Sequence, residues 1–154
     1  MSGWTGLQLL FIFCAFLFQI FLIVHFSFRK WAFALAIHYG WLVYALGILA
    51  AGASLLMLLK GMEWFFWIGG LIYLVWAAFG FVVEYIMKVE WRQPVYWPVF
   101  GPYVLLYLAT TMFYWFPLAR ISKPLWYIYA LLFLASTILN ITSHKKSLGT
   151  SRPD

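Results

Sequence analysis

The stretch LQLLFIFCAFLFQIFLIVHFSF, residues 7–28, decides the fold class, because its 22 consecutive residues include no Asp, Glu, Lys or Arg. The hydrocarbon core of a bilayer is about 30 Å thick and needs about 20 mostly apolar residues of α-helix to cross it. No basic region precedes the stretch and no small-residue cleavage site follows it, so it is not typical of a removable signal peptide. We therefore expect it to remain as a membrane helix.

Four further apolar runs extend this pattern along the chain. They cover about residues 31–59, 64–87, 99–118 and 125–142, within a domain of residues 1–143, and residues 144–154 form a polar tail. The second run is long enough to tilt or to begin with an interfacial turn. Of the 154 residues 66% are hydrophobic and 9% are charged, whereas soluble domains have about 25% charged residues. The sequence predicts an all-α, five-helix transmembrane bundle with short loops, because the alternating pattern of a membrane barrel is absent.

The basic residues predict an orientation for this bundle. One side of the membrane would hold seven of them, and the other side would hold Lys60, Arg120 and Lys123; the seven are Arg29, Lys30, Lys88, Arg92, Lys145, Lys146 and Arg152. The positive-inside rule then places the N-terminus outside and the C-terminus in the cytoplasm. We expect a bacterial or archaeal cytoplasmic membrane. The basic residues occur singly or in pairs and form no stripe, which excludes a nucleic-acid-binding protein.

Three ionisable residues are expected to share the inner leaflet: His25, His38 and Glu84. Tyr107 and Asn140 lie at comparable depth, and together these five form the expected pathway for a ligand or for protons. Ionisable groups inside a membrane are costly and normally face the protein interior. The structural alternatives are ordinary hydrogen-bonded histidines and an ion pair between Glu84 and Lys88, which are four residues apart.

The same three residues are weak candidates for a metal site, because no two of them have the spacing of ligands on one helix. A haem held by His25 and His38 is a still weaker possibility. The sequence identifies no cofactor. Cys14 is the single cysteine, so an internal disulfide is excluded.

The segment QPVYWPVFGP, residues 93–102, carries three prolines before the fourth span. Pro98 suits the first turn of a helix, whereas Pro102 is expected to kink or delay it. Gly101 would allow close approach of a ligand or a helix. As a functional element the segment would be a lid, with Trp91 and Trp97 as contacts and Arg92 holding an anionic headgroup. As a structural element it is a stiff re-entry loop.

Small, polar and aromatic residues predict how the helices pack. A tight hairpin between the second and third spans is expected from their small residues, which are Gly47, Ala51, Gly52, Gly69, Gly70, Ala77 and Gly80. Gln19, Thr110 and Thr111 near mid-membrane are expected to tie helices together. Most tryptophans fall near span ends, as interfacial residues do. A deeper aromatic set is expected to line a cavity; its members are Tyr44, Tyr73, Trp76, Phe79 and Tyr107.

One short stretch resembles a known family. Trp97, Phe100–Gly101–Pro102 and Leu106–Tyr107 are similar to the W-x-F-G-P…L-Y stretch of the tryptophan-rich translocator-protein family, which also has five helices and a similar length. Leu139–Asn140, near the end of the chain, also resembles part of the last helix of that family. In that family the stretch lies between the first two helices, whereas here it precedes the fourth span, so we carry over neither porphyrin nor cholesterol binding.

Three functions remain open at this point. The favoured hypothesis is a protein that binds or transports a small apolar or aromatic molecule, coupled to protons, through an inner-leaflet pocket. The second is an accessory or assembly subunit that packs against a partner membrane protein or a second copy of the chain. The third is an intramembrane enzyme acting on a lipid or isoprenoid, with His38 and Glu84 as acid and base. Whether the chain is an enzyme is undecided, and the bilayer is the one partner common to all three.

Overall fold

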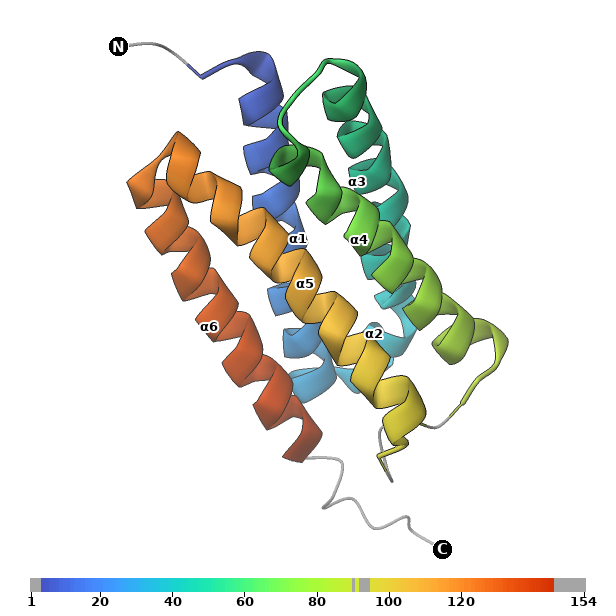
Figure 1. Ribbon diagram of the computed structural model, residues 1–154. Coiled ribbons are helices and arrows are strands. Elements are labelled where there is room, and N and C mark those ends of the chain that lie inside the picture. The colour runs from blue at the N-terminus through green and yellow to red at the C-terminus, as the bar shows by residue number, and fades with distance from the viewer. Residues whose placement is uncertain (1–3, 90, 92–94, 146–154) are drawn as a thin grey trace, which may run out of the picture.

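The computed structural model describes residues 4–89, 91 and 95–145, and its helices form a bundle (Figure 1). The elements in chain order are α1 (Gly6–Trp31), α2 (Phe33–Tyr39), α3 (Trp41–Leu59), α4 (Trp64–Phe81), the π-helix η1 (Val82–Ile86), α5 (Trp97–Ile121) and α6 (Lys123–Lys145). The described residues include no β-strand. Five spans are long and apolar enough to cross a membrane, which confirms the predicted number and type of spans.

The first helix begins at a capping box. The Thr5 hydroxyl accepts a hydrogen bond from the Gln8 amide at 3.3 Å, and the Gln8 side chain accepts one from the Thr5 amide at 3.0 Å. These bonds satisfy backbone donors that a helix start leaves unpaired. The helix ends at Trp31, and the non-helical backbone of Ala32 (φ −142°, ψ 66°) separates α1 from α2. The second span accordingly begins with the short helix α2 before Gly40 leads into α3.

Helices α3 and α4 form the tight hairpin that the small residues predicted. A methyl group added at Gly47 would lie 2.7 Å from the Ala77 side chain, and one at Gly70 would lie 2.6 Å from the Ala50 carbonyl oxygen. The turn between the helices uses Gly61 at φ +70°. Gly52 has no atom within 4 Å of its added methyl group, so that glycine is not part of the contact.

Helix α5 packs on the other side of α4, and α6 packs against α1 and α5 (Figure 1). A methyl group on Gly69 would lie 3.3 Å from the Phe113 backbone. The missing side chain of Gly69 therefore allows α5, and not α3, to approach α4 closely. Pro98 lies in the first turn of α5, as predicted, and Pro102 lies inside the helix. The expected delay by Pro102 is therefore wrong, because α5 has already begun at Trp97. Gly101 has nothing within 4 Å of an added methyl group, so no neighbouring helix packs closely against it.

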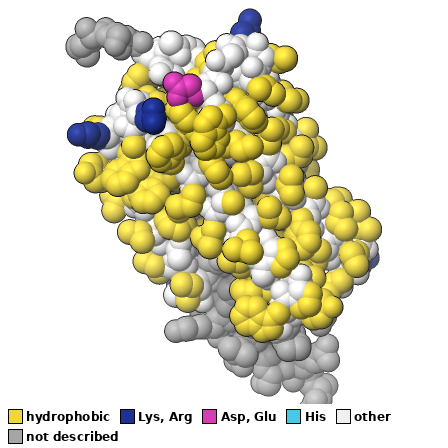
Figure 2. Space-filling model, in the orientation of Figure 1, with side chains coloured by type: hydrophobic (Ala, Val, Ile, Leu, Met, Phe, Trp, Pro, Cys, Tyr) yellow, Lys and Arg dark blue, Asp and Glu magenta, His cyan; other side chains and the backbone are white. Residues whose placement is uncertain are grey.

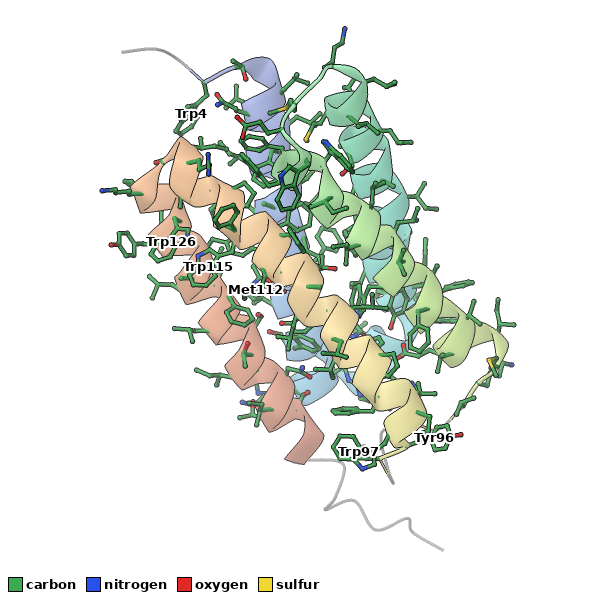
Figure 3. All side chains as sticks on the ribbon, viewed as in Figure 1. Trp4, Tyr96, Trp97, Met112, Trp115 and Trp126 are labelled. Atoms are coloured by element: carbon green, nitrogen blue, oxygen red, sulfur yellow. The ribbon has the colours of Figure 1, made fainter. Side chains whose placement is uncertain are left out.

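Aromatic residues mark both ends of the bundle (Figure 3). Trp115 and Trp126 stack across the α5–α6 turn with ring centroids 4.9 Å apart, and the Trp115 indole donates to the Trp126 carbonyl at 3.0 Å. Tyr96 and Trp97 lie at the opposite end, where α5 begins (Figure 3). Indole and phenol rings at these levels fit the two interfaces of a bilayer.

The surface is apolar between these ends. Hydrophobic side chains cover most of the face shown in Figure 2, and the charged side chains visible there lie mainly toward one end. Large exposed apolar residues occur on every spanning helix, including Phe13, Ile48, Val75, Leu105 and Leu131. Such a surface is compatible with an integral membrane protein, because lipid chains would cover it.

Candidate functional site

Glu84 is half-buried at the end of the bundle where α1 and η1 finish and α5 begins. Its carboxylate accepts a hydrogen bond from the Tyr44 hydroxyl of α3 at 2.8 Å. The Tyr44 hydroxyl also lies 3.4 Å from the Tyr103 hydroxyl of α5. We call Glu84, Tyr44 and Tyr103 the Glu84 cluster. Three different helical elements therefore supply its three polar groups.

The backbone near Glu84 departs from a regular α-helix. The π-helix η1 carries Glu84 at its centre, and the Met87 amide bonds to the Val82 carbonyl at 2.8 Å. Lys88 then has a left-handed backbone at φ 50°, a conformation that an L-residue with a side chain adopts only at a cost. The helical geometry required for the predicted pair between Glu84 and Lys88 is therefore absent. Short π-helical segments are frequent at functional sites.

Gly80 and aromatic rings shape the space around the cluster. A methyl group on Gly80 would lie 2.6 Å from the Tyr44 ring and 3.1 Å from the Tyr103 ring, so the missing side chain lets both rings reach α4. The Trp76 ring lies 5.6 Å from that of Tyr44 and 5.3 Å from that of Tyr103, measured between centroids. Tyr44 and Trp76, two of the aromatic residues expected to lie deep, thus form a wall of the site.

The two inner-leaflet histidines lie in different surroundings. His25 of α1 and the Tyr85 hydroxyl both lie beside Gly40, at 3.3 and 3.1 Å from where its added methyl group would be. His38 has an exposed side chain and packs on the Tyr39 ring at a centroid distance of 4.6 Å. The expected meeting of His38 with Glu84 inside the bundle is thus not found, because the α2 segment presents His38 at the surface.

The charged surroundings of Glu84 include a basic residue, and they also bear on the metal site that the sequence suggested. Arg29, in the last turn of α1, lies within electrostatic range of Glu84 and Tyr103. Over residues 4–89, 91 and 95–145, no group of three His, Cys, Asp or Glu side chains is placed to hold a metal ion. The weak metal candidates His25, His38 and Glu84 are therefore not gathered into one coordination site.

The predicted lid is described in part. Trp91 is buried, and its ring lies 4.7 Å from that of Tyr103 between centroids. Trp97 is 70% exposed at the start of α5, where it faces the surroundings of the bundle. Arg92 lies outside the described residues. Trp91 thus packs against the Tyr103 ring of the Glu84 cluster, whereas the exposure of Trp97 is compatible with a place at a membrane interface.

Tyr107 of α5 has its hydroxyl beside α6, and Asn140 belongs to α6. The Tyr107 hydroxyl is buried near Thr111 of its own helix and near Ser136 and Thr137 of α6. None of these three is in hydrogen-bonding geometry with it. Asn140 is partly buried in α6. Tyr107 is connected to the Glu84 cluster through Trp76, whose ring centroid lies 6.2 Å away.

Gln19, Thr110 and Thr111 were expected to form hydrogen bonds between helices, and no such bond is found among the described residues. Thr110 and Thr111 donate to the carbonyls of Leu106 and Tyr107 in their own helix, at 2.9 and 3.0 Å. Gln19 is fully buried, and its amide nitrogen and oxygen have no hydrogen-bond partner among the described residues. The sequence analysis did not single out Tyr114 and Tyr129, whose buried hydroxyls also have no hydrogen-bond partner among the described residues. The spacing of Tyr107, Thr111 and Tyr114, at i, i+4 and i+7, could have placed Tyr114 on the same helix face as Tyr107.

The Glu84 cluster offers a carboxylate and two phenol hydroxyls beside the aromatic ring of Trp76. A carboxylate of this kind can accept and release a proton, and the rings can contact an apolar or aromatic molecule. Comparisons of the chain with protein-family models, with curated proteins and with solved structures found no match.

Proposed function

We propose that the chain binds a small, largely apolar or aromatic molecule at the Glu84 cluster and couples its binding or transport to a proton on Glu84. The observation that supports this function best is the 2.8 Å hydrogen bond between the Tyr44 hydroxyl and the Glu84 carboxylate within the bundle. Keeping a carboxylate at this depth costs stability. A fold with 9% charged residues retains it there, and use in binding explains the retention.

The surroundings of the carboxylate favour an aromatic or apolar ligand. The rings of Trp76 and Trp91 both lie against that of Tyr103, with centroid distances of 5.3 and 4.7 Å. Aromatic rings gain energy from edge-to-face and offset contacts with further rings. The ligand would therefore place its ring against these side chains and a polar group toward Glu84.

Coupling to protons follows from the chemistry of the carboxylate. A charged Glu84 accepts the Tyr44 hydrogen bond, whereas a protonated one can donate its own hydrogen bond to a ligand. A ligand that needs one of these two states changes the proton occupancy when it binds. In this proposal the protein lies in a bacterial or archaeal cytoplasmic membrane, with the N-terminus outside and the Glu84 cluster in the cytoplasmic leaflet.

Calorimetry with purified protein in detergent micelles tests this function. The probes are 1-naphthol, 1-naphthoate and 1-naphthylmethylammonium, which share one ring system and differ in charge. Each is titrated in two buffers of different ionisation enthalpy, so that the protons exchanged on binding are counted. The wild type is expected to bind at least one probe with a measurable proton exchange.

Two variants make the experiment specific. Glu84→Gln keeps an acceptor for Tyr44 but cannot change charge, so we expect the proton exchange to vanish and the affinity to fall about tenfold or more, the size of a lost charged hydrogen bond. Glu63→Gln is the matched control, because Glu63 is exposed at the opposite end of the bundle. Unchanged binding and proton exchange in Glu84→Gln would remove this function, as would the absence of binding of all three probes to the wild type.

A further inference from the structure

The centre of the bundle contains buried polar atoms that the described protein residues do not satisfy. Five side chains have a nitrogen or oxygen of this kind, and we call them the mid-bundle polar cluster; they are Gln19, Trp76, Tyr107, Tyr114 and Tyr129. Each is at most 8% exposed. They come from α1, α4, α5 and α6, so the cluster belongs to the bundle as a whole.

Two of these residues lie well inside their spans. Gln19 is 13 residues into α1 and Trp76 is 12 residues into α4, which at 1.5 Å per residue places both about 18–20 Å along their helices. At such depths a bilayer offers no water. Tyr129 lies closer to the α5–α6 turn, within electrostatic range of Tyr107 and Tyr114.

Two hydroxyls beside Tyr107 bond within their own helices. Thr111 and Ser136 donate to the carbonyls of Tyr107 and Phe133, at 3.0 and 2.9 Å. Their protons are thus already used, and either oxygen could only accept a hydrogen bond from Tyr107. A buried polar atom without a partner lowers the folding equilibrium constant roughly fivefold or more. The hydroxyls of Tyr107 and Tyr114 lie within electrostatic range of Tyr129, and unsatisfied hydroxyls this near one another indicate that a bound group supplies the missing hydrogen bonds.

From these residues we infer a second binding site, in the middle of the bundle, for a small neutral hydroxylic group. The group is water or the hydroxyl of a small ligand. The Trp76 indole can only donate, the Gln19 amide both donates and accepts, and each tyrosine hydroxyl does both. A hydroxylic oxygen matches this set because it also donates and accepts. All five side chains lack a formal charge, and an ion at this depth would be unstabilised.

Radiolytic footprinting in ¹⁸O water tests the site. Hydroxyl radicals generated from ordered water oxidise adjacent side chains, and mass spectrometry locates the incorporated ¹⁸O. We expect Tyr114 and Tyr129 to be oxidised at least fivefold faster than Tyr73. Tyr73 is the matched control, since it is equally buried but its hydroxyl donates to the Val43 carbonyl. Equal rates for all three tyrosines would overturn the inference.

The source of the hydroxyl is identified by adding phenol as a probe. Protection of Tyr114 and Tyr129 by phenol would identify a site for a hydroxylic ligand, and unchanged oxidation would identify a site for water; both results support the inference. Neither result depends on Glu84, so Glu84→Gln is expected to show the same footprint as the wild type. A failure of the proposed function is therefore distinguishable from a failure of this site.

A stability measurement gives a second readout. If Tyr114 and Tyr129 bond to a bound hydroxylic group, Tyr114→Phe and Tyr129→Phe lose a hydrogen bond, and the folding equilibrium constant falls severalfold, as it does for Tyr73→Phe. If their hydroxyls have no partner, both variants fold more favourably than the wild type while Tyr73→Phe does not. That opposite pattern would contradict the inferred site.

Discussion

Replacing Gly70 by alanine tests the contact on which the α3–α4 hairpin depends. The added methyl group would lie 2.6 Å from the Ala50 carbonyl oxygen and 3.1 Å from the Ala50 carbonyl carbon, and it would also meet the Ser54 hydroxyl. A serine hydroxyl can rotate away, but the Ala50 backbone is held in α3. The two helices must therefore separate by nearly 1 Å to restore an ordinary contact of about 3.5 Å.

The size of the effect follows from this separation. A gap of 0.5–1 Å removes about a quarter to a half of the dispersion energy of each contact across it, and overpacking of a core typically costs about 1–3 kcal/mol. Gly52 provides the matched comparison, because it lies in α3 with open space around an added methyl group. There alanine is expected to stabilise the helix by up to about 1 kcal/mol. The two variants should differ by about 1–4 kcal/mol.

Thermal unfolding in detergent, followed by circular dichroism, measures this difference. At about 2–4 °C per kcal/mol for a chain of this size, Gly70→Ala should unfold between about 2 and 16 °C below Gly52→Ala. Equal midpoints, or a more stable Gly70→Ala, would refute the packing of α3 on α4 through Gly70. An equal gain in both variants would show that helix propensity and not the contact is being measured.

Three further results are expected. Lys88→Gly should raise the free energy of unfolding by about 1 kcal/mol, because glycine tolerates the left-handed backbone; an unchanged or lower midpoint in the same thermal assay would contradict the φ of 50° at Lys88. Gly80→Ala should displace the rings of the Glu84 cluster and weaken naphthyl-probe binding about tenfold or more, while Gly101→Ala, with open space at its added methyl group, should bind normally in the same calorimetric titration. Lys60→Cys, in a chain with Cys14→Ser, should react with an impermeant maleimide in intact cells, and reaction only after lysis would reverse the predicted orientation.

The positions of the spans followed from the sequence because bilayer thickness fixes their length. The fourth span was predicted as 99–118 and the helix is Trp97–Ile121, a difference of two or three residues at each end. Hydropathy ends where apolar residues end, but the backbone continues as helix into the interface, and Pro98 fits the first turn without losing a hydrogen bond. The small residues likewise predicted the hairpin, since close helix approach requires them.

The face on which each polar residue lies was harder to predict than its depth. Glu84 follows Tyr73, Ala77 and Gly80 at intervals of 4, 3 and 4 residues, so helical spacing places it on their buried face. His38 lies between Ala32 and Gly40, where α2 is separated from both neighbours. Once a helix is interrupted, the face of one segment no longer determines the face of the next. Depth counted along the chain therefore failed to show that His38 is exposed.

Trp76 joins the two sets of polar groups and suggests the order in which a ligand or proton would meet them. Its ring contacts Tyr44 and Tyr103 of the Glu84 cluster and also Tyr107 of the mid-bundle polar cluster. The charged group lies near one end of the bundle, and the side chains in the middle are neutral. This order matches the cost of charge in a membrane, which is greatest at the centre. Under the proposed function, a molecule passing from Glu84 into the middle of the bundle would therefore be neutral, having gained or lost a proton at Glu84 first.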